Sequence, residues 1–151
     1  MDHLLARDMS CITVLDISEP ALNRAKARLR ASHEQVTWIE ADVTADWPVT
    51  PVDIWHDRAL FHFLTDGRDR ARYVSQLRKA VKPGGMAILA TFAPDGPEKC
   101  SGLPVQRHDA STLRAELGDG FVLVDDLRDQ HRTPSGGVQA FCYAAFRRRS
   151  S

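Results

Sequence analysis

Two aspartates follow apolar, strand-like runs and are the first residues of this chain with a chemistry to offer. Asp16 ends the run ITVLD, and Asp42 follows the run QVTWIEA. A carboxylate at the end of a strand can accept two hydrogen bonds from a ribose diol, and a second one can accept from an adenine amino group. Each aspartate can equally cap a helix or occupy a turn. Read one at a time, the two positions leave both interpretations open.

A third strand-like run also ends in polar residues. The run VDIW (52–55) is followed by His56, Asp57 and Arg58. Ligands of doubly wound α/β sheets bind outside the carboxyl ends of the strands. We therefore expect these three residues and the two aspartates to lie along one rim of a sheet.

The three cysteines do not indicate a metal site. Cys11, Cys100 and Cys142 are odd in number and widely separated, and two of them lie in apolar strand-like runs. Their spacings are not those of a ligand cluster or of a disulfide framework. We expect reduced thiols, as in a cytosolic protein, and no bound metal.

The elements that position these residues alternate between short apolar runs and helical patterns, which is typical of an α/β fold. Helices are expected after the capping Ser18, over 66–81 and over 109–118, and KPGG is expected to end the second of them. We predict a mixed sheet of about six strands with helices on both faces. The parallel strands are 12–16, 36–43, 52–56 and 86–90, and the strands at 121–127 and 139–146 pair antiparallel.

Composition excludes several kinds of partner. The chain has 151 residues, of which 43% are hydrophobic, and its 20 basic side chains balance 20 acidic ones. This length predicts one domain, and balanced charge favours neither nucleic acid nor an anionic membrane. No apolar run approaches the roughly 18 residues of a membrane span, and the N-terminus has no signal-peptide pattern. We expect a cytoplasmic protein.

Taken in order, five segments resemble the class I S-adenosylmethionine-dependent methyltransferases over nearly the whole chain. They are VLDIS, IEADV, VDIWHDRALFHFL, LRKAVKPGGMAILATF and the closing antiparallel strand pair. VKPGG before a strand, the acid that ends ITVLD and the closing pair are the most specific of them. The resemblance implies a Rossmann-like α/β fold, with a mixed sheet that ends in an antiparallel strand.

The resemblance also assigns roles to individual residues. It implies that Asp16 binds the ribose hydroxyls of S-adenosylmethionine and that Ile17 flanks the adenine. His62 would face the transferred methyl group or the acceptor, where its imidazole could act as a general base or orient the acceptor. The remaining positions are Asp42 and Val43 at the adenine edge; Asp57, Arg58 and Ala59 at the methionine end, with His56; and Cys100, His131 and Arg132 in the acceptor loops.

One part of the family pattern is missing from this sequence. The first strand and the glycine-rich loop after it have no counterpart, and residues 1–10 match only the end of the following helix. We therefore expect residues 1–151 to form a single, incomplete methyltransferase-like domain with impaired cofactor binding. In the family, that strand lies between the strands that end at Asp16 and near Trp55. Their exposed edges predict direct pairing or a homodimer.

The predicted function is methyl transfer from S-adenosylmethionine to a small molecule, with a protein side chain as an open alternative acceptor. Such catalysis depends mainly on alignment and the exclusion of water. A second hypothesis is a non-catalytic remnant or assembly module that dimerises through strand edges. A nicotinamide-dependent oxidoreductase is disfavoured by the closing antiparallel pair and by the lack of a second domain.

Overall fold

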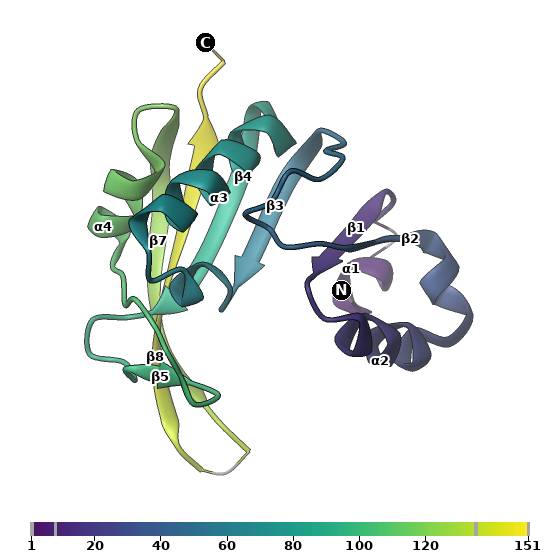
Figure 1. Cartoon of the computed structure of the whole chain (residues 1–151), viewed down its shortest axis with the longest axis horizontal. Helices are drawn as coiled ribbons and strands as arrows, with labels where there is room; N and C mark the ends of the chain where they lie inside the picture. The colour runs from purple at the N-terminus through teal and green to yellow at the C-terminus, as the bar shows by residue number, and fades with distance from the viewer. Residues whose placement is uncertain (1, 8, 135, 151) are drawn as a thin grey trace. The chain divides into compact units, whose positions relative to one another are not determined.

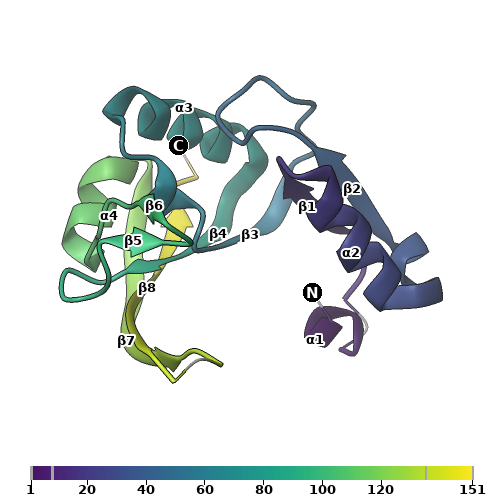
Figure 2. The same ribbon diagram turned by 60° about the horizontal axis from the view of Figure 1, so that its bottom comes forward.

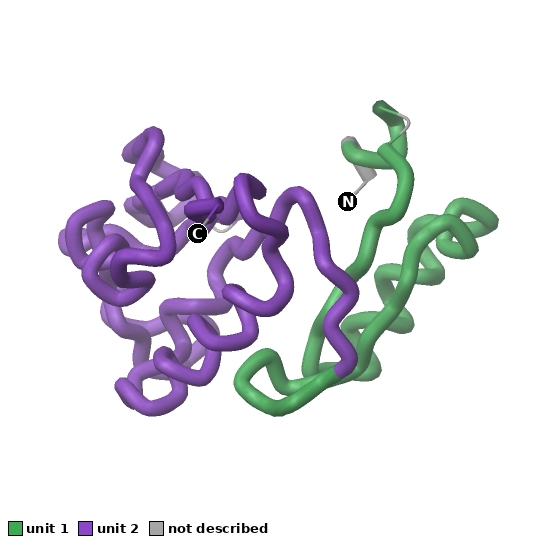
Figure 3. Tube along the Cα trace, turned by 90° about the horizontal axis from the view of Figure 1, so that it is seen from above, with its two compact units in different colours: residues 1–47 green, residues 48–151 purple. Residues whose placement is uncertain are grey.

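The computed structural model describes residues 2–7, 9–134 and 136–150. It divides into two compact units, residues 1–47 and 48–151 (Figure 3). The single domain that the sequence predicts stays a prediction. Among the described residues, no helix is long and apolar enough to span a membrane.

In the first unit, helix α2 packs beside a pair of parallel strands (Figure 1). Ser18 begins α2, as predicted, because its hydroxyl accepts a hydrogen bond from the Ala21 amide at 3.3 Å. Asp16 lies opposite Glu40 in the parallel pair, so the two carboxyl ends are adjacent. The elements are α1 (Asp2–Leu5), β1 (Ile12–Asp16), α2 (Glu19–Leu29), a 3₁₀ segment (Arg30–Gln35) and β2 (Val36–Glu40).

Strand β2 is shorter than predicted. It ends at Glu40, whereas the sequence predicts a strand as far as Val43. Asp42 Oδ1 accepts hydrogen bonds from the amide and the hydroxyl of Thr44, at 2.8 and 2.7 Å. This local bonding makes a turn where the apolar pattern alone favours a strand.

The second unit is a four-stranded sheet in the order β3–β4–β8–β7. Strands β3 and β4 are parallel, and β8 pairs antiparallel with both β4 and β7. The closing antiparallel pair predicted from the sequence is thus confirmed. The elements are β3 (Val52–Arg58), a 3₁₀ turn (Phe61–Phe63), α3 (Gly67–Ala80), β4 (Val81–Phe92), β5 (Lys99–Cys100), β6 (Leu103–Pro104), α4 (Ala110–Leu117), β7 (Phe121–Arg132) and β8 (Val138–Arg148).

Helices α3 and α4 lie on the same side of this sheet (Figures 1 and 2). Their apolar side chains Tyr73, Leu77 and Leu113 are fully buried, as are Leu89 and Phe146 of the strands. On the opposite face, a second cluster contains Ala90, Phe92 and Phe141, with Cys100 and Val105 packed against it. Each face of the sheet therefore has its own apolar core.

The segment KPGG lies within β4 but has no strand partner of its own, and the sequence predicts a strand that begins only at Met86. The register of β3 against β4 shifts just before Ile54, so these four residues form a bulge. Gly84 has a φ of 78°, and a Cβ on Gly85 would lie 2.8 Å from the carbonyl oxygen of Asp53. Both positions therefore favour glycine.

The predicted strands fall into two sheets, although one mixed sheet of about six strands was expected. Strand β1 pairs with β2 in one sheet, and β3 pairs with β4 in the other. Strands β1 and β3 are the two that the resemblance places on either side of a further strand. Direct pairing of β1 with β3, one of the two expected ways to cover their edges, does not occur within the described residues.

Candidate functional site

The carboxyl edge of β1 presents an acid and an exposed apolar side chain. Asp16 is half-buried, and its Oδ1 accepts a hydrogen bond from the Ser18 amide at 2.8 Å. Its second oxygen has no hydrogen-bond partner within the described part of the chain. Ile17 is 67% exposed. This edge can accept a hydrogen bond from a sugar hydroxyl and offer an apolar contact to a flat ring.

Asp42 and Val43 follow β2 at the same edge. The Ala41 amide donates to the carbonyl oxygen of Asp16 at 3.1 Å, which holds this segment against the end of β1. Asp42 is exposed, and one of its oxygens is engaged by Thr44. Val43 is 5% exposed, so its side chain belongs to the core of the first unit. Asp42 is therefore the accessible member of the predicted adenine-edge pair.

Asp57, at the end of β3, is the centre of a buried hydrogen-bond network. It accepts from the amides of Leu60 and Phe61 at 3.1 and 3.2 Å. The Tyr73 hydroxyl donates to it at 2.7 Å and accepts from Trp55 Nε1 at 2.9 Å. Burial raises the pKa of Asp57 to about 6, because its effect exceeds that of these hydrogen bonds, which lower the pKa. Both carboxylate oxygens are engaged within the protein, where they hold the turn after β3.

His62 lies in that turn with a defined tautomer. Its Nδ1 accepts a hydrogen bond from the Phe92 amide at 3.1 Å, so the hydrogen of the neutral ring is on Nε2. Nε2 is buried without a partner among the described residues. Burial, followed by the charge of His108, lowers the pKa of His62 to about 4. The side chain is also fully buried, so the ring is poorly suited to act as a general base.

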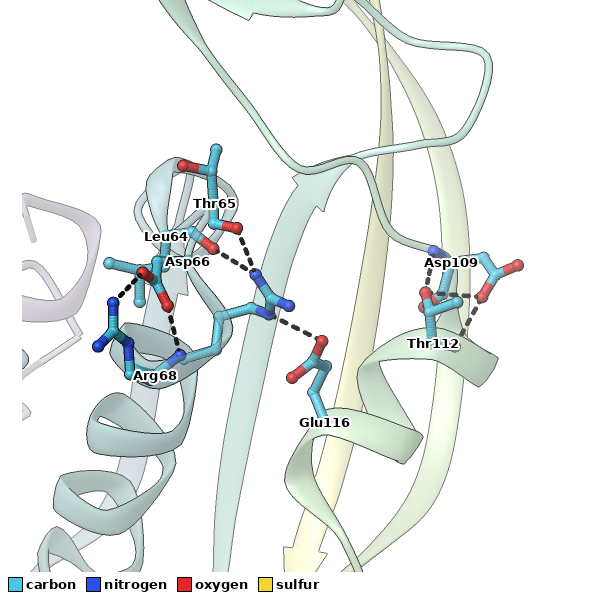
Figure 4. Close-up of polar contacts among 8 residues, drawn as sticks. Leu64, Thr65, Asp66, Arg68, Asp109, Thr112 and Glu116 are labelled. Carbon is cyan, nitrogen blue, oxygen red and sulfur yellow. Dashed lines mark hydrogen bonds and ion pairs between the residues drawn. The ribbon is translucent and has the colours of Figure 1, made fainter.

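Arg70 of α3 fixes the chain just after His62. Figure 4 labels its partners Leu64, Thr65 and Glu116. Its Nη1 donates to the carbonyl oxygens of Leu64 and Thr65 at 2.9 and 3.0 Å, and its Nε donates to Glu116 of α4 at 2.8 Å. The side chain of Arg70 is only 15% exposed, which favours a persistent ion pair. The two helices thus hold the His62 turn in place.

His108 is a buried residue that the sequence analysis missed. Its amide donates to the carbonyl oxygen of Phe92 at 2.9 Å, and its ring packs on Phe61 at 5.3 Å between centroids. Neither ring nitrogen has a partner among the described residues, and the same holds for the Thr91 hydroxyl. Burial lowers the pKa of His108. Because it lies in a polar loop, no periodic pattern could have indicated that it is buried.

Arg58 is adjacent to Asp57 in sequence but lies on the opposite face of the sheet, as strand alternation requires. Its Nε donates to the Tyr143 hydroxyl at 3.0 Å, and its guanidinium lies 4.9 Å from the centroid of the Phe141 ring. The next residue, Ala59, has a φ of 64° and packs against the Phe141 cluster. The side chain of Arg58 thus extends across β4 to β8.

Two of the three predicted acceptor-loop residues lie at the cluster that contains Phe141. Cys100 is half-buried against the cluster that contains Phe141. The ring of His131 meets Phe141 edge-on, with 6.3 Å between centroids. Arg132 is exposed at the end of β7. No set of three or more metal-ligating side chains comes together in the described ranges.

The predicted site residues therefore form two groups. Asp16, Ile17 and Asp42 share the edge of β1 and β2 in the first unit. In the second unit, Arg58 and His131 contact Phe141, and Cys100 packs against the cluster that contains it. The sequence analysis missed Phe141 and Tyr143, which join the second group. Their alternation in QAFCYAAF places both on one face of β8 and was a usable signal.

Comparisons with known proteins find similar methyltransferases. A methyltransferase of Mycobacterium bovis and one of Mycobacterium tuberculosis, both described as uncharacterized, are each 34% identical to this chain over 89 residues. The matched region is 58% of this chain and 43% of each relative, so the chain spans less than half of their length.

Solved structures share the fold at low sequence identity. A methyltransferase from Methanosarcina mazei gives a TM-score of 0.78 at 13% identity, covering 100% of this chain and 88% of that protein. The N-methyltransferase NodS of Bradyrhizobium japonicum, in complex with S-adenosyl-L-homocysteine, gives a TM-score of 0.69 at 16% identity. The match covers 91% of this chain and 66% of that protein.

The family itself is shown by a sequence profile. The profile of the methyltransferase domain matches residues 2–87, which is more than half of the chain and includes the edge of β1 and β2, the His62 turn and α3. The chain therefore belongs to the methyltransferase-domain family, the class I S-adenosylmethionine-dependent methyltransferases.

Proposed function

We propose that the protein containing this chain transfers the methyl group of S-adenosylmethionine to a nucleophilic atom of a small molecule. In such a reaction the acceptor atom gains the methyl group, the sulfonium sulfur takes the electron pair of the broken bond, and the acceptor's proton passes to a base or to water. The observation that carries the proposal is the free carboxylate oxygen of Asp16 beside the exposed Ile17, in a chain of this family.

The residues of the first unit fit the adenosine half of the cofactor. The free oxygen of Asp16 would accept from a ribose hydroxyl, and Ile17 would lie against the adenine. Asp42 is exposed at the neighbouring strand end and would accept from the adenine amino group. Val43, which is buried, would support Asp42 from below. The three contacts with the cofactor thus use side chains that are exposed or half-buried.

In the second unit, we assign Asp57 and His62 to positioning. The oxygens of Asp57 are engaged by the turn and by Tyr73, so it would shape the rim without touching the cofactor. The ring of His62 is fully buried, so it would support the turn after β3 without touching the acceptor. A proton released by the acceptor would then pass to water or to another group, because the Nδ1 of His62 is occupied.

A small acceptor fits the charge of the chain. Basic and acidic side chains are equal in number, and no basic stripe is available for a nucleic acid. We also expect this chain alone to bind the cofactor weakly, because no glycine-rich loop connects a strand to a helix in its sequence.

An NMR titration with S-adenosylhomocysteine tests the proposal even if binding is weak. We expect shifts at the amides of Ile17 and Asp42. Asp16→Asn can keep the hydrogen bond from Ser18 but loses the charged acceptor, so affinity should fall at least roughly tenfold. Glu40→Gln removes the same charge from the neighbouring strand end and should change little. Equal affinities for the two variants, or no shift at this edge at millimolar ligand, would remove Asp16 from the site.

A second candidate function is an assembly module that dimerises through strand edges. Within the described residues, β1 and β3 are edge strands, and Ile54 of β3 is 50% exposed. Sedimentation velocity at increasing concentration should then show a dimer. Ile54→Lys should shift it toward monomer, while Leu103→Lys, which replaces another exposed apolar side chain, should not. A monomer at all concentrations would exclude this function.

A further inference from the structure

The terminal nitrogens of Arg58 are oriented but unused. Nε is bonded to Tyr143, and the guanidinium lies over Phe141, so two contacts fix the group in place. Neither Nη atom has a partner within the described ranges. A guanidinium held in this way presents a pair of donors in a fixed geometry.

No acidic side chain neutralises Arg58. Among the described residues no carboxylate lies within ion-pair distance of it, whereas Arg70 pairs with Glu116 and Arg107 with Glu98. The Arg58 side chain is exposed and so remains accessible to a solute. An oriented and unpaired guanidinium has the geometry that matches a carboxylate with two parallel hydrogen bonds.

A second donor lies next to it. The Tyr143 oxygen accepts from Arg58, which leaves the hydroxyl hydrogen free to point elsewhere, and no acceptor for it is present in the described part of the chain. Tyr143 is half-buried, as is His131 on the neighbouring strand. Arg58 and Tyr143 thus offer converging donors at the carboxyl end of the parallel pair β3–β4, where α/β sheets bind their ligands.

We propose that Arg58, with Tyr143, binds a carboxylate of the methyl acceptor, so that the substrate is a small carboxylic acid. The inference rests on the proposed methyl transfer and names its substrate class. The guanidinium reaches over β4 to Phe141 of β8, whose ring also meets that of His131, so it lies on the same face of the sheet as this predicted acceptor-loop residue. The other source of a carboxylate is the methionine end of the cofactor, and the test separates the two.

Benzoate is the probe, with benzamide as its uncharged counterpart, followed through the Nε–H signal of Arg58 by NMR. Benzoate should shift this signal and the ring signals of Tyr143, and benzamide should not. Arg58→Gln should weaken benzoate binding by about tenfold or more, and Tyr143→Phe should weaken it several-fold. The control Arg68→Gln, at a side chain that is 87% exposed, should leave binding unchanged.

Two results overturn the assignment. Equal benzoate binding by Arg58→Gln and Arg68→Gln would show that Arg58 is not the anion-binding group. A shift of the Arg58 signal by S-adenosylhomocysteine, in competition with benzoate, would assign Arg58 to the cofactor's own carboxylate. Failure of the proposed function is a separate outcome: S-adenosylhomocysteine would leave Ile17 and Asp42 unshifted while benzoate still bound.

Discussion

At the scale of single residues, the polar groups at the end of β3 have different roles although they are neighbours in sequence. Asp57 turns inward, where Tyr73 and two amides hold it, while Arg58 turns to the opposite face and remains unpaired among the described residues. His62, four residues further on, has its basic nitrogen engaged by the Phe92 amide. Asp57 and His62 are therefore parts of the scaffold, and Arg58 is accessible to a solute.

Tyr73→Phe tests the buried network. It removes the hydroxyl that donates to Asp57 and accepts from Trp55, so urea unfolding should show a loss of about 1–3 kcal/mol. The pKa of Asp57 should also rise above its value of about 6, because the lost hydrogen bond lowers it. Tyr143→Phe, which alters a half-buried hydroxyl, should cost less than about 0.5 kcal/mol. Equal losses in the two variants would contradict this account of the network.

The pH dependence of stability should reveal two opposing groups. Burial lowers the pKa of His62 from 6.5 to about 4, so its contribution is present above pH 6.5 and is lost as pH falls toward 4. Burial raises the pKa of Asp57 from 3.8 to about 6, so its contribution is present below pH 3.8 and is lost as pH rises through 6. The two effects partly cancel between pH 4 and 6.

Asp57→Asn should remove this compensation. Whatever its absolute stability, the variant should lose stability more steeply than the wild type as pH falls from 6.5 to 4.5, because the contribution of Asp57 that grows in that range is absent. Urea unfolding at several pH values measures the slope. Parallel curves for the two proteins would mean that Asp57 does not titrate in this range.

At the scale of elements, the connection from α3 to β4 depends on close backbone packing. The bulge places Gly85 against the Asp53 carbonyl oxygen, with no room for a Cβ. The helix before it begins at Gly67, where an added Cβ would meet only Arg70 at 3.6 Å. Of these two glycines, Gly85 has no room for a side chain, whereas Gly67 has room for a methyl group.

Gly85→Ala and Gly67→Ala form a matched pair. The first substitution forces the β3–β4 backbones apart and should destabilise the chain by about 1–3 kcal/mol. The second adds a methyl group without a clash in a helical turn and should be neutral or stabilising by up to about 1 kcal/mol. Urea unfolding measures both, and a loss in Gly67→Ala equal to that in Gly85→Ala would refute the packing argument.

The sequence predicts the helices and strands well, because most of them have a clear periodic pattern of apolar residues or a capping residue. Ser18 begins α2, and the closing pair β7–β8 forms as expected, but its strands extend beyond the apolar runs that predicted them. The polar second half of β7 is mostly exposed, and its sequence shows no alternation of hydrophobic and polar residues. Backbone hydrogen bonds to β8 continue the strand to Arg132. The sequence also could not reveal which oxygens of Asp57 and which nitrogen of His62 are already engaged, because their partners are distant side chains and backbone amides.

At the scale of the whole molecule, the two units differ in how many apolar side chains they bury. In residues 1–47 the described core consists of Leu22, Val36 and Val43, whereas the second unit has fully buried side chains on both faces of its sheet. Burial sets the free energy of local opening. The unit with the proposed nucleoside-binding edge should therefore be the less stable one.

Hydrogen exchange monitored by NMR measures this difference. Amides of β4 and β8 should exchange slowest, and those of β1 and β2 at least about a hundredfold faster, which corresponds to roughly 3 kcal/mol. Saturation with S-adenosylhomocysteine should slow exchange in β1 and β2 more than in β4. Uniform protection over both units would show that they open together.

The opposite placement of Asp57 and Arg58 also bears on how this chain can diverge. Along residues 54–58, alternate side chains either support the helices or face the proposed acceptor region. Substitutions at positions 54, 56 and 58 can then change substrate preference with little loss of stability. Positions 55 and 57 tolerate fewer substitutions, because their side chains join the buried network of Tyr73. In a library of all single variants selected for folded protein, tolerance should alternate with a period of two along this strand, so new substrates could evolve here at little cost in stability.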